Sequence, residues 1–344
     1  MKTVGFLFED QKIERLGLTS RMGVLKSADL RFVKIDPYLP IDGQGPFDVI
    51  LHKLSDLGDE DLTLHHELES YVSRHPEVIC IDPLSSVYAL ANRYDQCRVL
   101  SSSLNQSTLA DTVFVPGFCL AKRNSTDENL KLMLENGIRF PLICKQLATE
   151  SEPNTRKMAL VFNARGLEAL NYPILLQQFI NHDARLFKLF VIGKFVHIRL
   201  RPSIRNLSPS SSGENIFFES NTISKEYSVS PLNVAGAVDN EHTALSMRQR
   251  SLLLDIARQL RTDLKLDLFG IDVVECSGED ILRTSTGACG DPNVNEKTTV
   301  RYAVIDVNPA PGYSGVPNFP EHLENLIREK LSLPLIPVPS GTMA

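Results

Sequence analysis

Short apolar runs alternate with amphipathic segments along the first third of the chain. The apolar runs read VGFLF, RFVKID, FDVILHKL and VICIDP, and each has the length of a strand. Between them, residues 18–30 and 65–74 place their apolar side chains at helical spacing. Because strands that alternate with helices are typical of a parallel sheet, we expect an α/β domain over residues 1–110.

The middle of the chain has another pattern, in which strands are joined mainly by loops. A helix is expected over residues 86–104, and VFVPGFCLA then indicates a change of unit at its proline and glycine. The strands FPLICK and MALVFN flank a polar loop at 146–157, and PILLQQFI follows them. We therefore expect a compact α+β unit of antiparallel strands over residues 111–184.

The last part of the chain begins with a long apolar run over residues 185–203. Gly193 and Lys194 interrupt this run and predict the turn of a β-hairpin. A helix is expected over residues 247–264. We place a third domain at 185–335.

Two further apolar strands, LFGIDVVE and YAVIDVN, are expected at 268–275 and 302–308. The stretch between them, residues 277–299, is rich in Gly, Ser, Thr and Asn, so we expect a flexible insertion. Residues 336–344 end the chain as a proline-rich tail.

Composition and charge argue against several classes of function. The chain of 344 residues is 42% hydrophobic and 23% charged, as in an ordinary globular protein of two or three domains. A net charge of -6 provides no overall basic field for nucleic acid or for an anionic membrane. The sequence has no signal-peptide pattern and no apolar run of the roughly 20 residues that cross a bilayer. Six widely spaced cysteines are expected to be free thiols in a cytoplasmic protein.

Polar side chains interrupt the last two apolar strands. Asp306 and Asn308 are two residues apart in YAVIDVN, so they face one side of the strand, which we expect to lie away from the core face of Val304 or towards a cavity. Asp272 has an equally apolar setting in FGIDVV. Burying such groups without partners is costly, and Mg²⁺ prefers oxygen ligands of this kind. The alternative is that the two carboxylates cap turns or pair with an arginine.

Several cations lie near the ends of predicted strands. Lys145 ends FPLICK, Lys188 lies within the hairpin strand LFKLFVIG, and Arg201 ends its partner. Lys12 and Lys53 follow or flank strands of the N-terminal domain. In an acidic protein these five cations could together bind several phosphate groups.

Other motifs that would indicate a specific chemistry are missing. His52, His65, His66 and His75 suggest a metal site, but HHELE is not the HExxH of a zinc protease, and a solvated helix face is expected instead. The sequence also lacks the P-loop, the GxGxxG loop and the HRD and DFG motifs of protein kinases.

Nearly end to end, the chain resembles the inositol 1,3,4-trisphosphate 5/6-kinases, also called inositol-tetrakisphosphate 1-kinases. The strings that carry the likeness are VGFLFEDQKI, FDVILHKLSD, FPLICK, QQFINHDARLFKLFVIG, RPSIRNLS, IFFES, FGIDVV and VIDVNPAPGYSGV. The resemblance implies an ATP-grasp fold, a mixed α/β and α+β architecture whose two subdomains would be 111–184 and 185–335. It implies a monomer that transfers the γ-phosphate of ATP to a hydroxyl of an inositol tris- or tetrakisphosphate.

The resemblance also implies a role for each matching residue. The nucleotide would be bound by Arg93, Lys145, Gln177, Gln178, Phe179, Ile180, Ser203, Ser220 and Ser224. The inositol polyphosphate would be bound by Lys12, Lys53, Lys188, Arg201, Asn308 and Gly312. Magnesium, expected as two ions, would be held by Asp272, Asp306 and Asn308. Lys188, between the two substrates, and Asp306 would be the catalytic residues.

The loop after Lys145 departs from the family pattern. Family members carry a His-Gly or Asp-Gly pair there and a Ser-His pair before the next strand, whereas QLATESEPNTRK contains neither glycine nor histidine. Arg156 is expected to replace the histidine as a phosphate ligand, and Glu150 and Glu152 would oppose this. Two alternatives therefore remain: a weakened member that binds its ligands without efficient turnover, and an ATP-grasp ligase that joins a carboxylate to an amine.

Overall fold

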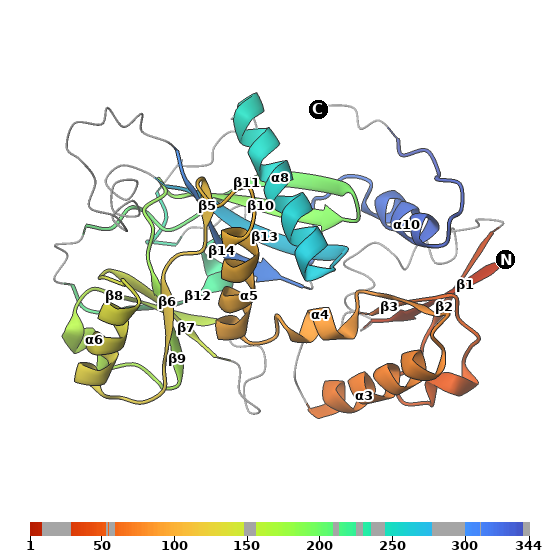
Figure 1. The fold of residues 1–344 in the computed structure, drawn as a ribbon, viewed down its shortest axis with the longest axis horizontal. Helices are drawn as coiled ribbons and strands as arrows, with labels where there is room; N and C mark the ends of the chain where they lie inside the picture. Colours follow the sequence, from red (N-terminus) through yellow and green to blue (C-terminus); the bar gives the residue numbers. More distant parts are fainter. Residues whose placement is uncertain are drawn as a thin grey trace.

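Three sheets lie one after another along the long axis of the molecule (Figure 1). The computed structural model describes residues 1–8, 29–52, 54, 59–147, 156–208, 213–224, 230–234, 245–276, 300–309 and 311–339. Lys12, Lys53, Glu150, Glu152 and the expected insertion at 277–299 lie outside the described residues. In the part of the chain that is described, no helix has the length and apolar character needed to cross a membrane.

The N-terminal sheet is parallel, as the sequence predicts. In spatial order its strands are β2 (Leu30–Lys34), β1 (Lys2–Leu7), β3 (Val49–His52) and β4 (Ile79–Ile81). Helix α3 (Asp59–Arg74) and the 3-10 turn η1 (Ile41–Gly43) cover one face, where Leu68 and Tyr71 pack against Ile50.

The central sheet is antiparallel, as the sequence predicts for this part of the chain. Its strands, in spatial order, are β12 (Ile216–Glu219), β8 (Lys157–Val161), β7 (Leu142–Gln146), β9 (Ile174–Gln178) and β6 (Phe118–Ala121). Helices α6 (Thr126–Glu135) and α7 (Ala164–Leu167) cover one face through Met133 and Leu167. The 3-10 turn η2 (Ser220–Thr222) follows the edge strand β12.

The C-terminal sheet contains the predicted hairpin. Its strands, in spatial order, are β11 (Phe195–Pro202), β10 (Arg185–Ile192), β13 (Leu268–Glu275), β14 (Tyr302–Asn308) and β5 (Val113–Phe114). Ile192 pairs with Phe195 around the turn, and Gly193 has a φ of +56°, which glycine adopts without strain. Helix α8 (Met247–Leu264) has the predicted bounds and begins with a capping box at Ser246.

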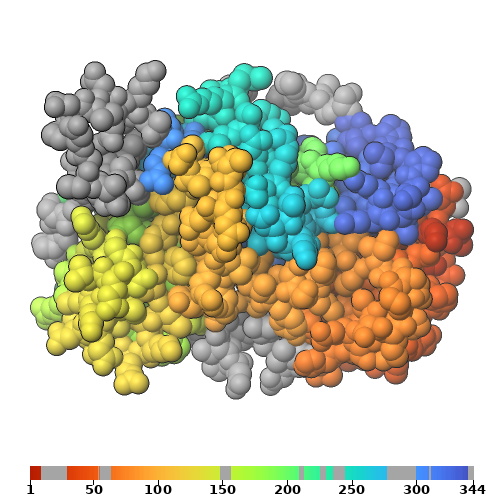
Figure 2. Space-filling view, viewed as in Figure 1, coloured from red at the N-terminus to blue at the C-terminus, as the bar shows by residue number. Residues whose placement is uncertain are grey.

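The two faces of this sheet have different neighbours. Leu189, Ile271 and Val304 belong to one core with Leu253 and Ile256 of α8. Helices α5 and α8 lie side by side over this face and fill the middle of the molecular surface in Figure 2. We call this side the helix face and the other side the opposite face.

Two edge strands cross the boundaries expected between the central and C-terminal units. Strand β5 falls within 111–184 but pairs with β14 of the C-terminal sheet, and β12 falls within 185–335 but pairs with β8 of the central sheet. The two units are therefore interlocked by an exchange of strands.

The single helix expected over residues 86–104 is wrong, because the structure has two helices. They are α4 (Leu84–Tyr88) and α5 (Arg93–Asn105). The Asn92 side chain accepts hydrogen bonds from the backbone N–H groups of Tyr94 and Asp95, so it caps a new helix. As a result, Arg93 stands at the first turn of α5.

The C-terminal segment packs along helix α10 (Phe319–Lys330). The side chain of Asn325 exchanges two hydrogen bonds with the backbone of Ile336, and Asn318 donates one to the carbonyl of Pro339. Residues 336–339 of the expected tail are thus held by specific contacts.

A buried carboxylate joins the first and last sheets. Asp82 is 3% exposed, and its two oxygens accept hydrogen bonds from the backbone N–H groups of Asp267 (2.6 Å) and Leu268 (3.0 Å). The same two sheets share a hydrophobic core that includes Phe6 of β1 and Phe190 of β10. The N-terminal sheet and the C-terminal sheet therefore pack as one body.

We expect Asp82→Ala to lower the free energy of unfolding by about 3 kcal/mol, because two backbone N–H groups lose a charged acceptor in a buried place. Urea unfolding followed by circular dichroism measures the change. The exposed Asp111→Ala is the matched control and should change stability by less than about 0.5 kcal/mol. Equal stabilities for the two variants would show that Asp82 does not join the sheets.

Candidate active site

Four charged residues form a row across the C-terminal sheet. Lys188 on β10 lies directly opposite Arg199 on β11 and Asp272 on β13, and Asp272 lies opposite Asp306 on β14. Directly opposite residues of antiparallel strands project from the same face. The row therefore runs from two cations to two carboxylates on the opposite face of the sheet.

An ion pair lies in the middle of this row. The Nζ atom of Lys188 is 2.7 Å from Oδ1 of Asp272, and the two side chains are 22% and 21% exposed. Burial acts to lower the pKa of Lys188, but the charge and hydrogen bond of Asp272, together with the charge of Asp306, outweigh it and raise the pKa above its ordinary value. Lys188 is therefore a cation throughout the physiological range of pH.

A β-bulge places Asp306 on this face. Asp272 pairs with Asp306 but Val273 pairs with Val304, so Ile305 is an extra residue in β14. In a regular strand Asp306 would share the side of Val304, which packs in the core of the helix face. The extra residue shifts the alternation by one, so Asp306 projects from the opposite face, beside Asp272.

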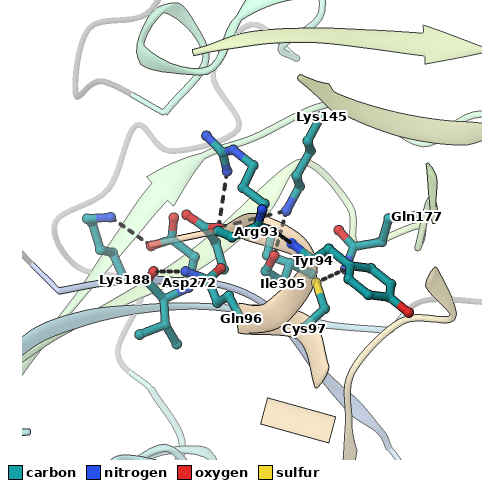
Figure 3. A network of polar contacts seen from close by, with 12 residues as sticks. Arg93, Tyr94, Gln96, Cys97, Lys145, Gln177, Lys188, Asp272 and Ile305 are labelled. Carbon is teal, nitrogen blue, oxygen red and sulfur yellow. Dashed lines mark hydrogen bonds and ion pairs between the residues drawn. The ribbon is translucent and has the colours of Figure 1, made fainter. Parts of the chain in front are cut away.

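Two further cations reach Asp306 from other elements. Nη1 of Arg93, at the start of α5, is 3.4 Å from Oδ1 of Asp306. Nζ of Lys145, on β7, donates a hydrogen bond to the carbonyl oxygen of Ile305 (2.7 Å) and lies 3.9 Å from Oδ1 of Asp306. Lys145 is only 4% exposed, so its charge is directed into the junction between the two sheets (Figure 3).

These oxygen donors fit Mg²⁺ only with ligands added from outside the protein. Asp272 and Asp306 are partly exposed on one face, and Asn308, two residues further along β14, is exposed. No group of three or more His, Cys, Asp or Glu side chains suited to a metal gathers within the described ranges. A magnesium ion at Asp272, Asp306 and Asn308 would complete its six positions with phosphate oxygens and water, as this ion usually does.

The segment Gln177–Ile180 connects the central sheet to the C-terminal sheet. Phe179 packs in a cluster with Leu160 of the central sheet, whereas Ile180 packs with Leu186 and Ala303 of the C-terminal sheet. The residues expected to hold the adenine therefore form the connection between the two interlocked units.

The side chains of the two glutamines in this segment already make contacts within the protein. Gln177 is 1% exposed, and its Nε2 lies 3.8 Å from the thiol of Cys97. Oε1 of Gln178 accepts a hydrogen bond from the backbone N–H of Arg139 at 2.7 Å. Contacts of these two residues with a nucleotide would therefore come mainly from their backbone groups.

His182 is a buried partner of this segment and is not among the residues predicted from the sequence. Its Nδ1 is 2.6 Å from the carbonyl oxygen of Ile180, and its Nε2 is 2.7 Å from Oγ of Ser203. Burial lowers the pKa of His182, so the ring is neutral, Nδ1–H donates to Ile180 and the Ser203 hydroxyl donates to Nε2. Ser203, expected near the nucleotide, is thus tied to the connecting segment. The string FINH, which ends with His182, was the feature of the sequence that could have indicated this histidine.

The remaining residues expected at the site lie at two places. The carbonyl of Arg156 accepts a hydrogen bond from the backbone N–H of Ser220 at 3.0 Å, and Ser224 follows η2, so these three lie around the β8–β12 edge of the central sheet. Arg201 lies on β11 two residues beyond Arg199, and Gly312 is exposed in the turn after β14.

Two histidines that were expected on a solvated helix face are buried instead. His65 of α3 is 3% exposed because its ring packs on Tyr88, with the ring centres 3.7 Å apart. His52 ends the buried strand β3, where Nε2 lies 2.5 Å from the carbonyl oxygen of Asp82. That expectation is wrong for both residues.

Gln96 is a second residue near the site that was not predicted from the sequence. It is 5% exposed and lies one turn after Arg93 on α5. Its Nε2 donates to the carbonyl oxygen of Val307 (2.5 Å), and its Oε1 accepts from the N–H of Val307 (3.4 Å). Gln96 therefore fixes the part of β14 between Asp306 and Asn308.

The fold and the arrangement of the site define an ATP-grasp protein. The structure matches N5-carboxyaminoimidazole ribonucleotide synthetase from Thermotoga maritima with a TM-score of 0.55 and 12% identity, covering 98% of this chain and 78% of the other. It matches a RimK domain ATP-grasp protein from Sphaerobacter thermophilus with a TM-score of 0.52 and 16% identity, covering 95% and 98%. At these identities the likeness shows the fold alone.

Sequence comparison identifies the family. Residues 3–87 match the inositol 1,3,4-trisphosphate 5/6-kinase pre-ATP-grasp domain, and residues 107–281 match the ATP-grasp domain of the same family. Inositol-tetrakisphosphate 1-kinase of Xenopus laevis is 31% identical over 97% of this chain and 80% of its own length, and that of Danio rerio is 33% identical over 92% and 76%. Inositol-tetrakisphosphate 1-kinase 2 of Glycine max is 31% identical over 95% and 96%.

The chain belongs to the inositol 1,3,4-trisphosphate 5/6-kinase family. The predictions of an ATP-grasp fold and of an inositol polyphosphate kinase that uses ATP are thereby confirmed. The alternative of a carboxylate–amine ligase is not favoured, because the relatives that share substantial sequence identity are named as kinases.

We expect Gln96→Leu to lower the free energy of unfolding by about 2 kcal/mol, because a side chain of similar size leaves two backbone groups of Val307 without partners. Turnover should fall as well, since β14 loses the contact that fixes Asp306. Thermal unfolding and a kinase assay measure the two effects. The exposed Gln106→Leu on the end of the same helix is the control, and a Gln96→Leu variant indistinguishable from it would contradict the assignment.

Proposed function

We propose that this chain transfers the γ-phosphate of ATP to a free hydroxyl of an inositol tris- or tetrakisphosphate, at the row formed by Lys188, Asp272 and Asp306. The observation that carries the proposal is the convergence of three cations and two carboxylates where the central and C-terminal sheets meet. Phosphoryl transfer requires positioning and neutralisation of charge more than a dedicated nucleophile on the protein. This arrangement supplies both.

The nucleotide would lie between the two sheets, with its base against the segment Gln177–Ile180. Lys145 lies on β7, which pairs with β9, and Arg93 lies one turn before Cys97, the partner of Gln177. Both cations are directed at Asp306. They would bind the phosphate groups of ATP. Ser203, Ser220 and Ser224 would complete the nucleotide site.

Asp272, Asp306 and Asn308 would hold magnesium, which we propose as two ions. The ions would neutralise charge on the nucleotide phosphates. Asp306 acts in this scheme as a ligand and as the acceptor for Lys145 and Arg93, and no base is required of it.

The inositol polyphosphate would lie towards the N-terminal unit, residues 1–110. Lys188 would contact both substrates because it stands in the middle of the row. Arg201 and the backbone at Gly312 would bind phosphate groups of the acceptor, together with Lys12 and Lys53. We propose that Arg156 adds a phosphate contact at the β8 edge.

We propose a cytoplasmic monomer with the units 1–110, 111–184 and 185–335. The five cysteines within the described ranges, Cys80, Cys97, Cys119, Cys144 and Cys276, are free thiols, which is compatible with a reducing compartment. Burial raises the pKa of Cys97 to about 11, so this thiol is unreactive next to the site.

Incubation with Mg-ATP and a panel of inositol tris- and tetrakisphosphates, with products separated by isomer, tests the function. We expect ADP to form in step with a new inositol phosphate. Asp306→Asn should lower kcat about 100-fold without unfolding the protein, because a preorganised charge is lost at the reacting groups. Asp255→Asn, on the exposed side of α8, is the control. Turnover that survives Asp306→Asn would refute the metal assignment.

A weakened member would bind the same ligands but form negligible ADP. The altered loop after Lys145 is the feature that favours this second candidate. If the wild type binds inositol phosphates but phosphorylates none, we expect Arg156→His to restore measurable turnover in the same assay. An active wild type, or an Arg156→His variant that stays inactive, would exclude the loop as the cause.

A further inference from the structure

Arg199 extends the charged row by one strand, and the assignments above leave it without a role. Strand β11 alternates between the two faces of the sheet. Val196, Ile198 and Leu200 pack against the core of the helix face. His197, Arg199 and Arg201 therefore project from the opposite face, where Arg199 stands directly across from Lys188.

The turn after β14 approaches the guanidinium of Arg199 closely. A Cβ atom built onto Gly315 would collide with Nη1 of Arg199 and lie 3.2 Å from its Cζ. Gly315 also has a φ of +78°, a conformation that glycine adopts without strain. Because no side chain intervenes, Arg199 lies against the backbone of the turn that contains Gly312. It is thus located between Lys188 and the turn proposed to bind the acceptor.

Among the described residues, several positive charges lie near Arg199 on β11. Burial, and after it the charges of Arg199, Arg250, His322 and Arg201, lower the pKa of His197 to about 4. Arg201 also acts to lower the pKa of Lys188. A phosphate group bound at this place would be attracted by Arg199, Arg201 and Lys188 together. The cluster stands out in a protein whose net charge is -6.

We propose that Arg199 binds a phosphate group of the inositol polyphosphate, beside Lys188 and Arg201, and thereby favours acceptors that carry a phosphate at that position of the ring. The proposal rests on the proposed function, since it assigns a substrate contact within the same site. A guanidinium suits this role because it can donate two parallel hydrogen bonds to one phosphate. Arg199 orients the acceptor and takes no part in the transfer itself.

Calorimetric titration tests the assignment by measuring Kd for an inositol tetrakisphosphate and for Mg-ATP separately. We expect Arg199→Gln to raise the Kd of the tetrakisphosphate about tenfold, which is the loss of a hydrogen-bonded charge contact. Arg199→Lys, which keeps the charge, should lie between Arg199→Gln and the wild type. The Kd of Mg-ATP and the Tm should not change.

Arg258→Gln is the matched control, because Arg258 is an exposed arginine on α8, over the other face of the sheet. The proposal is overturned if Arg199→Gln binds the tetrakisphosphate like Arg258→Gln. It is also overturned if Arg199→Gln weakens Mg-ATP binding equally and lowers the Tm, because Arg199 would then only support the turn at Gly315.

Inositol hexakisphosphate separates this proposal from the proposed function, because it has no free hydroxyl and can be bound without accepting a phosphate. If the wild type phosphorylates no inositol phosphate but Arg199→Gln still weakens hexakisphosphate binding, the kinase proposal fails and the Arg199 contact stands. If the wild type and Arg199→Gln both phosphorylate the inositol phosphate with the same KM for it, the kinase proposal stands and only the Arg199 contact fails. A wild type that binds none of these compounds would overturn both.

Discussion

The bulge at Ile305 determines which side of the C-terminal sheet carries the metal-binding candidates. Without the extra residue, Asp306 and Asn308 would project with Val304 towards α5 and α8, where two polar groups would enter an apolar core. With it, they share a face with Asp272 and Lys188. The bulge also involves the carbonyl of Ile305, which accepts the hydrogen bond from Lys145. One local irregularity thus positions a carboxylate and anchors a cation from the neighbouring sheet.

The rest of the site follows from how the sheets are joined. Strands β5 and β12 are exchanged between the central and C-terminal units, and the segment Gln177–Ile180 packs in the cores of both. The break between α4 and α5 puts Arg93 at the start of a helix that also contributes Gln96 to β14. Site residues that are far apart in the sequence are therefore brought together by the same strands, helix and connecting segment that join the sheets.

Much of this architecture could be predicted from the sequence. Alternating strand and helix patterns indicated the parallel N-terminal sheet, and Gly193 with Lys194 indicated the hairpin. The polar positions Asp272 and Asp306, within apolar strands, identified a pair of carboxylates that the structure places opposite each other. In these cases local periodicity and turn chemistry agree with the final fold.

The remainder depends on contacts that a periodic pattern does not contain. A strict two-residue period would put Asp306 on the side of Val304, so the expected orientation away from that core face is reached only through the bulge, which the strand pairing reveals. His65 has the spacing of a solvated helix position, yet Tyr88 from another element covers it. The exchange of β5 and β12 likewise depends on tertiary pairing. Arg199 is not among the residues predicted from the sequence, because its place in the row and the close approach of Gly315 both depend on tertiary structure.

The Asp82 contact has a consequence for motion. Its carboxylate and the continuous core around Phe6 and Phe190 attach the N-terminal sheet to β13, only a few residues from Asp272. Separating these two sheets would expose a buried charge and apolar surface at once. The central sheet is joined to the C-terminal sheet by other means, namely the exchanged strands β5 and β12, the segment Gln177–Ile180 and polar contacts such as that of Lys145. If the sheets move relative to one another when nucleotide is exchanged, the moving part is therefore expected to be the central sheet, while the N-terminal and C-terminal sheets stay together.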